Sequence, residues 1–204
     1  MSISQSQLHL LKLLELCVTI FRGPDAEEWA NLAKVGVPEL LASVQKNPNT
    51  LLVPIQNLNQ LKADLSDENI SLLETEYVRL FIAGSGGIPA PLYESCHLGT
   101  TPRTMGQSAL DMQNRLQEAG LEISLESNEP ADHLTIELEF LFYLLSEGWF
   151  GESEQANQGV EFAESIMLPW VRRFRDALNK ANPHPVFAGT ADITVTTLEA
   201  ISKI

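Results

Sequence analysis

The residues that could carry chemistry gather in two short stretches. The first is Glu94-Ser-Cys-His97, which holds a carboxylate, a hydroxyl, a thiol and an imidazole side by side. The second is Glu129-Pro-Ala-Asp-His133, in which Asp132 directly precedes His133. A histidine beside an acid can act as a general base, a metal ligand or a hydrogen-bond donor in recognition. Local hydrogen bonds can also hold such a histidine with no further role.

Neither stretch has the spacing of a known metal or nucleophile site. A dimetal bundle needs two Glu-x-x-His motifs on helices, and the sequence has one, Glu94 to His97, in a proline-rich loop. There is no His-Glu-x-x-His motif, and Ser95 is not in a Gly-x-Ser-x-Gly elbow. The glycine-rich residues 84–87 lack the Gly-Lys-Ser/Thr ending of a phosphate loop. The sequence therefore has no enzyme signature, and we expect no metal site and no permanently bound cofactor.

A third stretch, upstream of these two, supplies an aromatic helix face and a long loop. Tyr77, Leu80 and Phe81 stand at i, i+3 and i+4, so a helix places them on one face. Periodicity alone is also typical of core packing. The loop that follows, residues 84–102, is too long for a passive connection in a compact domain. Because loops on a rigid scaffold often hold function, we expect this loop to be functional.

The elements that must position these residues have a helical pattern nearly throughout. We expect an all-α fold, a single-domain bundle of about nine to ten helices over residues 1–204. Gly36 should stop one helix, and Pro169 should break or restart another. Pro130 should begin a buried central helix that ends near Gly148. Start and stop signals place the helices at about 4–22, 25–35, 39–46, 51–65, 67–83, 104–119, 130–148, 152–167, 170–181 and 186–204.

Two segments of this pattern are less regular. Asn47-Pro-Asn49 is typical of a turn, and residues 122–128 are polar and should be irregular. In the last helix, residues 194–197 are poor helix formers, so this segment could instead hold a short strand.

The charge distribution favours a cationic partner over a nucleic acid. The 204 residues include 27 acidic and 13 basic ones, for a net charge of −14, and a nucleic-acid binder would need a basic face. Between Arg115 and Arg172 there is no Lys or Arg and there are twelve acidic residues. An ordinary solvated helix surface would explain part of this run. A field of one sign would also attract a basic peptide.

The N-terminal residues, the length of the apolar runs and the cysteines together predict a cytoplasmic protein. Residues 2–7 are polar without a basic region, which argues against a signal peptide. No apolar run reaches the roughly 18 residues that a membrane span needs. Cys17 and Cys96 lie far apart without paired spacing, and we expect free thiols in a reducing compartment.

Taken together, three stretches resemble the TorD/DmsD/NarJ family of redox enzyme maturation chaperones. They are Glu76-Tyr-Val-Arg-Leu-Phe81, Pro91-Leu-Tyr-Glu-Ser95 and Glu129-Pro-Ala-Asp-His133. The resemblance implies an all-helical, TorD-like, cytoplasmic chaperone that serves a molybdoenzyme of the DMSO, TMAO or nitrate reductase type. Such a chaperone binds the twin-arginine signal peptide of the apo-enzyme catalytic subunit, delays its export through the Tat pathway and assists insertion of the molybdenum cofactor. Contact with that cofactor would be transient and would run through the client.

The resemblance also implies a set of binding residues for the signal peptide and the client. We expect Asp132 and nearby acids to meet the arginines, and the aromatic side chains to receive the apolar segment. His97 departs from the pattern, because relatives often have an aromatic residue there. The family has been linked to guanine nucleotides, for which this sequence has no phosphate motif. The expected binding residues are Tyr77, Leu80, Phe81, Pro91, Tyr93, Glu94, Ser95, Pro130, Asp132 and His133.

Two other classes of function stay open at this stage. One is a small helical hydrolase or isomerase that uses His133 with Asp132 or Glu94. The other is an adaptor that binds a folded protein and ignores leader peptides. The oligomeric state is also open between a monomer and a domain-swapped dimer, since long connections permit swapping.

Overall fold

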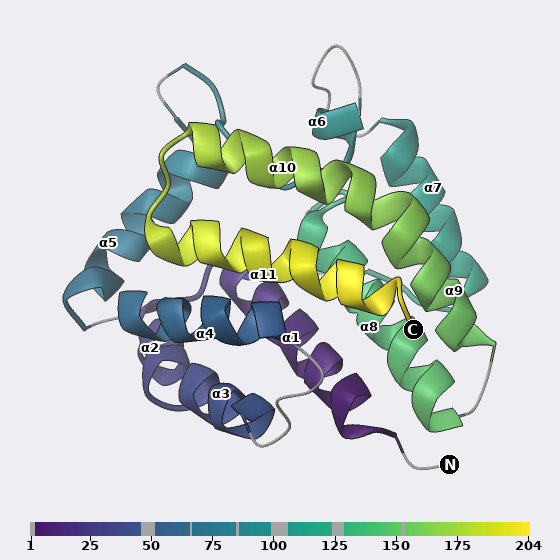
Figure 1. Ribbon diagram of the computed structural model, residues 1–204. Helices are drawn as coiled ribbons and strands as arrows, with labels where there is room; N and C mark the ends of the chain where they lie inside the picture. Colours follow the sequence, from purple (N-terminus) through teal and green to yellow (C-terminus); the bar gives the residue numbers. More distant parts are fainter. Residues whose placement is uncertain are drawn as a thin grey trace.

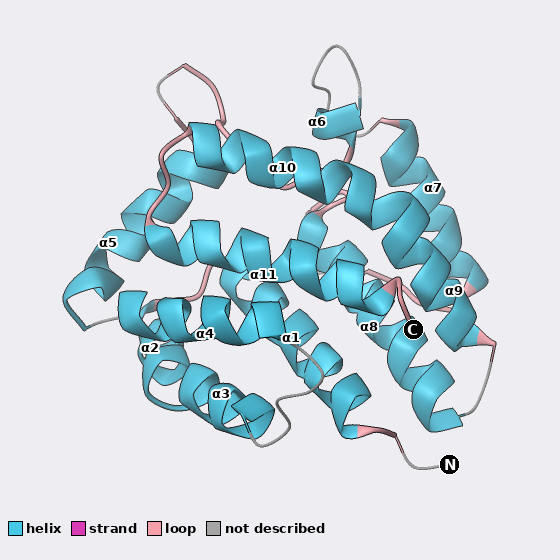
Figure 2. Cartoon of the chain, viewed as in Figure 1, coloured by secondary structure: helices cyan, strands magenta, loops and turns pink. Residues whose placement is uncertain are grey.

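Helices account for the regular structure in the part of the chain that the structure describes. This computed structural model describes residues 3–45, 52–65, 67–84, 86–98, 106–123, 129–151 and 154–204. Figure 2 shows helices and loops and no strand in these ranges. Their β structure is a single isolated antiparallel bridge between Tyr93 and His133. If a helix that continues through a π-helical turn counts once, these ranges hold nine helical segments. The predicted all-α bundle of nine to ten helices is confirmed.

The elements follow one another along the chain with three π-helical turns, labelled η1 to η3. In order they are α1 Gln5–Arg22, α2 Ala26–Asn31, η1 Leu32–Gly36, α3 Val37–Gln45, α4 Leu52–Asp64, α5 Asp67–Tyr77, η2 Val78–Ile82, α6 Ser95–Leu98, α7 Gln107–Glu118, α8 Leu134–Gly151, α9 Gln155–Glu161, η3 Phe162–Met167, α10 Leu168–Lys180 and α11 Pro185–Ile201.

The helices pack around α11 and α1. In Figure 1, α10 and α11 lie side by side, and α11 also packs against α4 and α1. α1 in turn packs against α8, which packs against α9. Aromatic rings fill the core between these helices. Phe81 contacts Phe21, Phe174 and Phe187 with centroid distances of 6.0, 6.2 and 5.4 Å.

The ends of α1 lie close to the predicted range of 4–22. Ser4 accepts a hydrogen bond from the backbone N–H of Gln7, whose side chain accepts one from Ser4 in return. At the other end Gly23 has φ +82°, the left-handed conformation that glycine adopts without a Cβ penalty. A Cβ at Gly23 would also lie 2.8 Å from Cζ of Tyr77. This position therefore excludes other residues on two grounds.

The predicted stops at Gly36 and Pro169 are wrong. The helix passes Gly36 through η1, where the Val37 N–H donates to the Leu32 carbonyl oxygen, five residues back. It passes Pro169 through η3 into α10, where the π-helical turn directly before the proline accommodates the backbone hydrogen bond that proline cannot donate. In both places a π-helical turn, with one extra residue, joins two α-helical segments that the sequence pattern separates.

The predicted start of the central helix at Pro130 is also wrong, because α8 begins at Leu134. The backbone before it pairs with the loop instead. The Glu94 N–H donates to the Asp132 carbonyl oxygen at 3.0 Å, and the Leu134 N–H donates to the Leu92 carbonyl oxygen at 2.8 Å. These bonds hold residues 130–133 in a turn against the loop. α8 is buried along most of its length, as predicted.

The remaining irregular segments can be placed only in part. The predicted loop 84–102 contains the short helix α6, while residues 85 and 99–102 lie outside the described residues. The predicted turn at 47–49, residues 104–105 and most of 122–128 lie outside them as well. The possible strand at 194–197 is absent there, because α11 is helical throughout. The hydroxyls of Thr190 and Thr194 donate to backbone carbonyls four residues earlier, which suits a helix.

Candidate functional site

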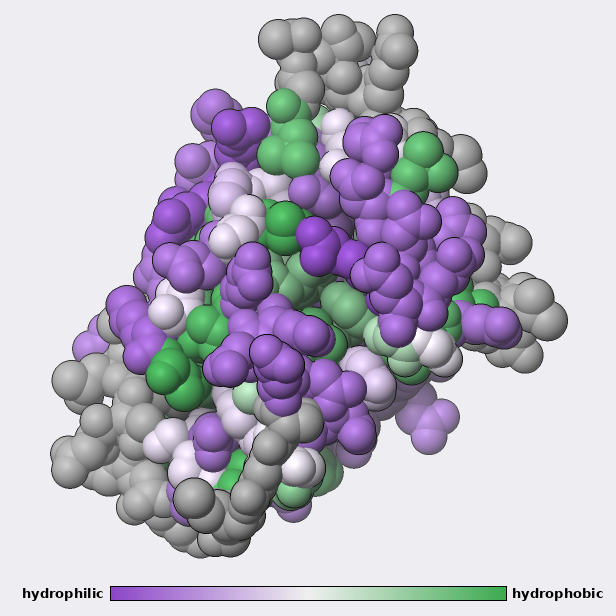
Figure 3. All heavy atoms as spheres, turned by 90° about the vertical axis from the view of Figure 1, so that its right-hand side faces the viewer, coloured by the Kyte–Doolittle hydropathy of each residue, from purple (hydrophilic) through white to green (hydrophobic). Residues whose placement is uncertain are grey.

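A groove of about 810 Å³ opens between the end of α1, the end of α5, the segment after α7 and one face of α8. Ile136, Glu139, Phe140 and Tyr143 project into it from α8, at the spacing of a single helix face. The nearby face over α7 and α9 in Figure 3 is mostly hydrophilic, with hydrophobic patches between. The groove is lined by Arg22, Tyr77, Leu116, Leu121, Glu122, Ile123, Glu129, His133, Thr135, Ile136, Glu139, Phe140 and Tyr143.

Tyr77 forms the end of the groove next to α1. Its hydroxyl donates a hydrogen bond of 3.0 Å to the Phe21 carbonyl oxygen, and its ring lies 5.0 Å from the Phe81 ring. Burial raises the pKa of Tyr77 to about 12, and the charge of Glu129 adds to the shift. The phenol is therefore protonated and acts as a donor. It connects the predicted aromatic motif to the end of α1.

Tyr93 and His133 join the two motif stretches that lie far apart in sequence. They form the isolated β-bridge, and their rings meet edge to face with centroids 5.2 Å apart. The Tyr93 hydroxyl donates to Glu129 Oε2 at 2.5 Å. Burial, followed by the hydrogen bond with Glu129, raises the pKa of Tyr93. The stretches around residues 91–95 and 129–133 thus form one continuous wall beside the groove.

His133 caps α8 with its ring. Its Nδ1 accepts a hydrogen bond from the Thr135 N–H at 3.3 Å and lies 2.7 Å from Thr135 Oγ1. This pairing assigns the proton to Nε2, on the basis of hydrogen-bond partners. Burial lowers the pKa of His133, against the opposing charges of Glu129 and Asp132, so the ring is neutral at pH 7. Because His133 also lines the groove, it offers a neutral donor there.

Glu94 and Asp132 of the wall form a cluster of three buried carboxyl groups with Glu137 of α8. Asp132 has no exposed surface, and its Oδ2 accepts a hydrogen bond of 3.0 Å from the Ser95 N–H at the start of α6. Glu137 is fully buried and accepts one of 2.9 Å from Trp170 Nε1. Burial, and then the charge of Glu94, raises the pKa of Glu137 well above its ordinary value. Burial also raises the pKa of Glu94.

This cluster is not arranged as a metal site. Within the described ranges, no group of three or more His, Cys, Asp or Glu side chains is placed to hold a metal ion. Both cysteines are free thiols, Cys17 buried and Cys96 partly buried.

The predicted binding residues divide between the groove surface and its support. Of the ten, Tyr77 and His133 line the groove. Leu80 and Phe81 are 0% and 2% exposed and belong to the core. The others build the wall. They are Pro91, Tyr93, Glu94, Ser95, Pro130 and Asp132.

His97, the departure from the family pattern, occupies an aromatic position. Its ring is stacked on Trp170 with centroids 5.8 Å apart and meets Phe174 edge to face at the same distance. Its Nε2 donates to the Pro91 carbonyl oxygen at 2.7 Å. Burial lowers the pKa of His97. The imidazole therefore packs as an aromatic ring and also holds the loop through one hydrogen bond.

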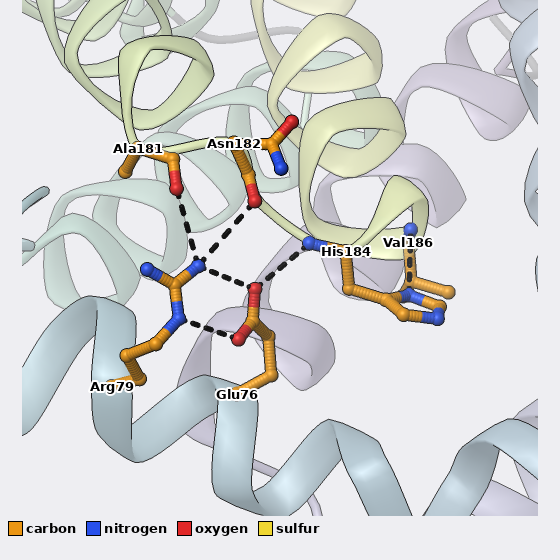
Figure 4. A network of polar contacts seen from close by, with 6 residues as sticks. All are labelled: Glu76, Arg79, Ala181, Asn182, His184 and Val186. Carbon is orange, nitrogen blue, oxygen red and sulfur yellow. Dashed lines mark hydrogen bonds and ion pairs between the residues drawn. The ribbon is translucent and has the colours of Figure 1, made fainter.

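Sequence reasoning missed the ion pair between Glu76 and Arg79 within the aromatic motif. Both guanidinium contacts with the carboxylate are 2.7 Å, and Glu76 also accepts a 2.9 Å hydrogen bond from the His184 N–H (Figure 4). Arg79 Nη2 further donates to the Ala181 carbonyl oxygen at 3.3 Å. This network fixes the helix carrying Tyr77 to the turn between α10 and α11. The spacing of opposite charges at i and i+3 was the available signal.

Sequence reasoning identified the acidic run between Arg115 and Arg172 and missed which of its residues line the groove, as well as the place of Arg22 there. Glu122, Glu129 and Glu139 line it, together with one cation, Arg22, which forms an ion pair with Glu139. The side chains of Arg22 and Glu139 are 65% and 49% exposed. The acids that meet solvent in the groove are therefore these glutamates, while Asp132 lies behind them.

No helix in the described ranges combines the length and the apolar character that crossing a membrane requires.

Comparison with known proteins finds curated relatives that are chaperones. The Tat proofreading chaperone DmsD of Salmonella typhimurium is 27% identical over 126 residues, covering 62% of this chain and 58% of DmsD. The chaperone protein TorD of Aeromonas salmonicida is 28% identical over 150 residues, covering 67% of this chain and 63% of TorD. The chain thus matches about three fifths of the length of these curated relatives.

A crystal structure and a family model complete the comparison. The crystal structure, of a candidate redox enzyme maturation protein from Archaeoglobus fulgidus, is 22% identical with a TM-score of 0.49, covering 100% of this chain and 94% of that one. The family model of the nitrate reductase delta subunit matches residues 50–176, which is more than half of the chain. The chain therefore belongs to the nitrate reductase delta subunit family, and its resemblance to the TorD/DmsD/NarJ chaperones is confirmed.

Proposed function

We propose that this protein is a chaperone dedicated to the maturation of a molybdoenzyme and that its groove binds the twin-arginine signal peptide of the apo-enzyme precursor. In this function it delays export of the client through the Tat pathway and assists insertion of the molybdenum cofactor. The observation that carries the proposal is the groove, in which one face of α8 meets the wall built from the two motif stretches. The names of the relatives DmsD and TorD support the same class of function.

The lining of the groove suits a segment that is partly apolar and partly basic. The side of the groove formed by α8 is apolar, since the partly exposed Tyr143 lines it together with Ile136 and Phe140, which are 9% and 6% exposed. Helical or extended peptides commonly bind to apolar grooves. Three glutamates against a single arginine give the groove a negative field, in a protein of net charge −14. Such a field speeds the encounter with a cationic peptide and weakens as salt is added.

Within this function we assign two roles to the predicted residues. Tyr77 and His133 contact the peptide, and His133 donates from Nε2 to a peptide carbonyl. Asp132 and Glu94 act by holding the wall in place, because both are buried. We infer binding without catalysis, since the Nδ1 atom of His133 already accepts from the Thr135 N–H and is not free to act as a general base.

Calorimetric titration with a twin-arginine leader peptide tests the proposal. We expect binding that weakens when both arginines are replaced by glutamine, and a smaller loss for the double-lysine peptide, because lysine lacks the planar guanidinium fork. The Tyr143→Arg variant, which places a cation in the groove, should bind poorly. The matched control is Phe150→Arg on the same helix, where the side chain is 59% exposed and lies outside the groove. Equal affinities for all three peptides would contradict the proposal.

A further inference from the structure

An ion pair inside the groove joins Arg22 to Glu139. Among the described residues that line the groove, Arg22 is the single arginine or lysine, and three glutamates line the groove with it. The guanidinium of Arg22 donates to Glu139 Oε1. The groove of the free protein therefore already contains the contact that an arginine of a bound peptide would make.

The fold fixes both partners of this pair. Arg22 is the last residue of α1, next to the left-handed Gly23, and Tyr77 holds this helix end through the Phe21 carbonyl oxygen. Glu139 stands on the open face of α8, one turn from Ile136 and Tyr143. Because α1 packs against α8, the fold places the guanidinium of Arg22 next to the carboxylate of Glu139.

The pair is also easy to exchange. The side chains are 65% and 49% exposed, and ion pairs at such sites contribute little to stability. Arg22 can turn into solvent without leaving a buried group unpaired. An incoming peptide arginine can make the same contact, and the apolar part of the peptide adds contacts on α8 that Arg22 does not make.

We propose that Glu139 is the acceptor for one arginine of the leader peptide and that Arg22 occupies this acceptor until the peptide displaces it. This inference rests on the proposed function and names a residue pair within the same site. Arg22 makes the groove selective, because a ligand without a guanidinium group must open the ion pair and leaves Glu139 without a replacement partner. The need to displace Arg22 from Glu139 lowers the affinity of the groove for every ligand. It lowers the affinity least for ligands that contain arginine, because these replace the lost contact with Glu139.

A double-mutant cycle on the peptide affinity tests this inference. The Arg22→Gln variant should bind the twin-arginine peptide about two- to fivefold more tightly, as expected for removal of an exposed competing pair. Glu139→Gln should bind about two- to fivefold less tightly. In the double variant the gain from Arg22→Gln should disappear, because the acceptor for which the two arginines compete is gone.

The control is Arg172→Gln, which removes the same charge from an exposed ion pair with Glu199 outside the groove. It should leave the affinity within the error of the measurement. An unchanged or weaker affinity of Arg22→Gln, or a gain that persists with Glu139→Gln, would overturn the inference. If the wild-type protein fails to bind any leader peptide, the proposed function itself fails. Binding by the wild type with no effect of Arg22 overturns the inference alone.

Discussion

The hydroxyl of Tyr77 donates a 3.0 Å hydrogen bond to the carbonyl oxygen of Phe21, in the last turn of α1. The last four carbonyls of a helix have no partner within the helix, and Tyr77 supplies one from a neighbouring element. The same contact places Arg22 at the groove. A residue of the aromatic motif thus acts on the groove both by lining it and by fixing the helix end beside it.

We expect Tyr77→Phe to lower the free energy of unfolding by about 1 kcal/mol, the usual net contribution of a single hydrogen bond. Urea unfolding measures this change. The matched control is Tyr143→Phe, since the Tyr143 hydroxyl lines the same groove without a hydrogen bond in the described part of the chain. Equal stability losses for the two variants would contradict a specific role for the bond to Phe21.

Asp132 provides a second prediction, which separates support of the wall from direct peptide contact. Its carboxylate is buried and accepts from the Ser95 N–H. Asp132→Ala should cost about 1–3 kcal/mol, because it removes the acceptor of that donor. Asp132→Asn retains an acceptor oxygen and removes a charge beside Glu137, so it should cost less. Both values come from urea unfolding.

Peptide affinity then distinguishes the two roles of Asp132. If the residue only supports the wall, Asp132→Asn should bind the leader peptide as the wild type does. A large loss of affinity with unchanged stability would show that Asp132 meets the arginines directly, as the sequence led us to expect.

The local signals in the sequence account for most of the fold. The predicted first helix, at residues 4–22, and the predicted helix start at residue 67 lie close to the observed ends of α1 and the observed start of α5. The continuation of the helices through Gly36 and Pro169 could not be predicted, because a π-helical turn depends on packing against neighbouring helices. Pro130 has the sequence of a first helical turn, yet the pairing of residues 132–134 with the loop outweighs that local preference.

The sequence predicted which two stretches of the chain build the site, and it predicted less well which side chains line the groove. The motifs indicated that the residues around Tyr93 and His133 belong together, and they form a bridge. The open face of α8 was hidden because apolar residues surround that helix, so periodicity could not select the side with Glu139. The burial of Asp132 was equally invisible, since an acid before a helix usually meets solvent.

The raised pKa of Glu137 gives a pH-dependent prediction. A carboxyl group whose pKa is higher in the folded state than in the unfolded state binds more protons when folded. Its contribution to stability is therefore present below the ordinary pKa of 4.5 and is lost as the pH rises towards the folded value. Glu137→Gln removes this loss and can still accept from Trp170 Nε1.

We expect the stability of Glu137→Gln relative to the wild type to increase steadily as the pH rises above 4.5. Urea unfolding at several pH values up to 8 measures the difference. Glu164→Gln, at an exposed position of η3, serves as the control and should show no such trend. A difference that is independent of pH would show that Glu137 is ionised in the folded protein.

For the network of Glu76 and Arg79 we predict a pH dependence of stability opposite to that of Glu137. The hydrogen bond from Arg79 is the main cause that lowers the pKa of Glu76, so this stability is present above the ordinary pKa of 4.5 and lost as the pH falls below it. A double-mutant cycle of Glu76→Gln and Arg79→Gln at pH 7 should give a coupling of about 1 kcal/mol, reduced by the partial exposure of Arg79. At pH 3 the coupling should shrink.

The pair Arg172–Glu199 is the control for this cycle. Its side chains are 51% and 35% exposed, and neither holds a turn between helices. Its coupling should stay below about 0.5 kcal/mol. If the two cycles give the same coupling, the attachment of Arg79 to the α10–α11 turn adds nothing to stability.

His97 supplies the last prediction, because its ring combines stacking with a hydrogen bond. Burial lowers the pKa of His97 below its ordinary 6.5, so the unfolded chain binds more protons there and stability falls as the pH drops through that range. His97→Phe retains the stacking on Trp170 and loses the 2.7 Å bond to the Pro91 carbonyl oxygen. At pH 7.5 the variant should be less stable by about 1 kcal/mol.

On acidification this deficit should shrink, since the phenylalanine cannot be protonated. Urea unfolding of both proteins at pH 7.5 and 5.5 measures the change. His97→Gln is the companion variant, which retains a donor for Pro91 and loses the ring. If stacking matters more than the hydrogen bond, His97→Gln is the less stable of the two at both pH values. An equal deficit of His97→Phe at the two pH values would mean that folding does not shift the pKa of His97.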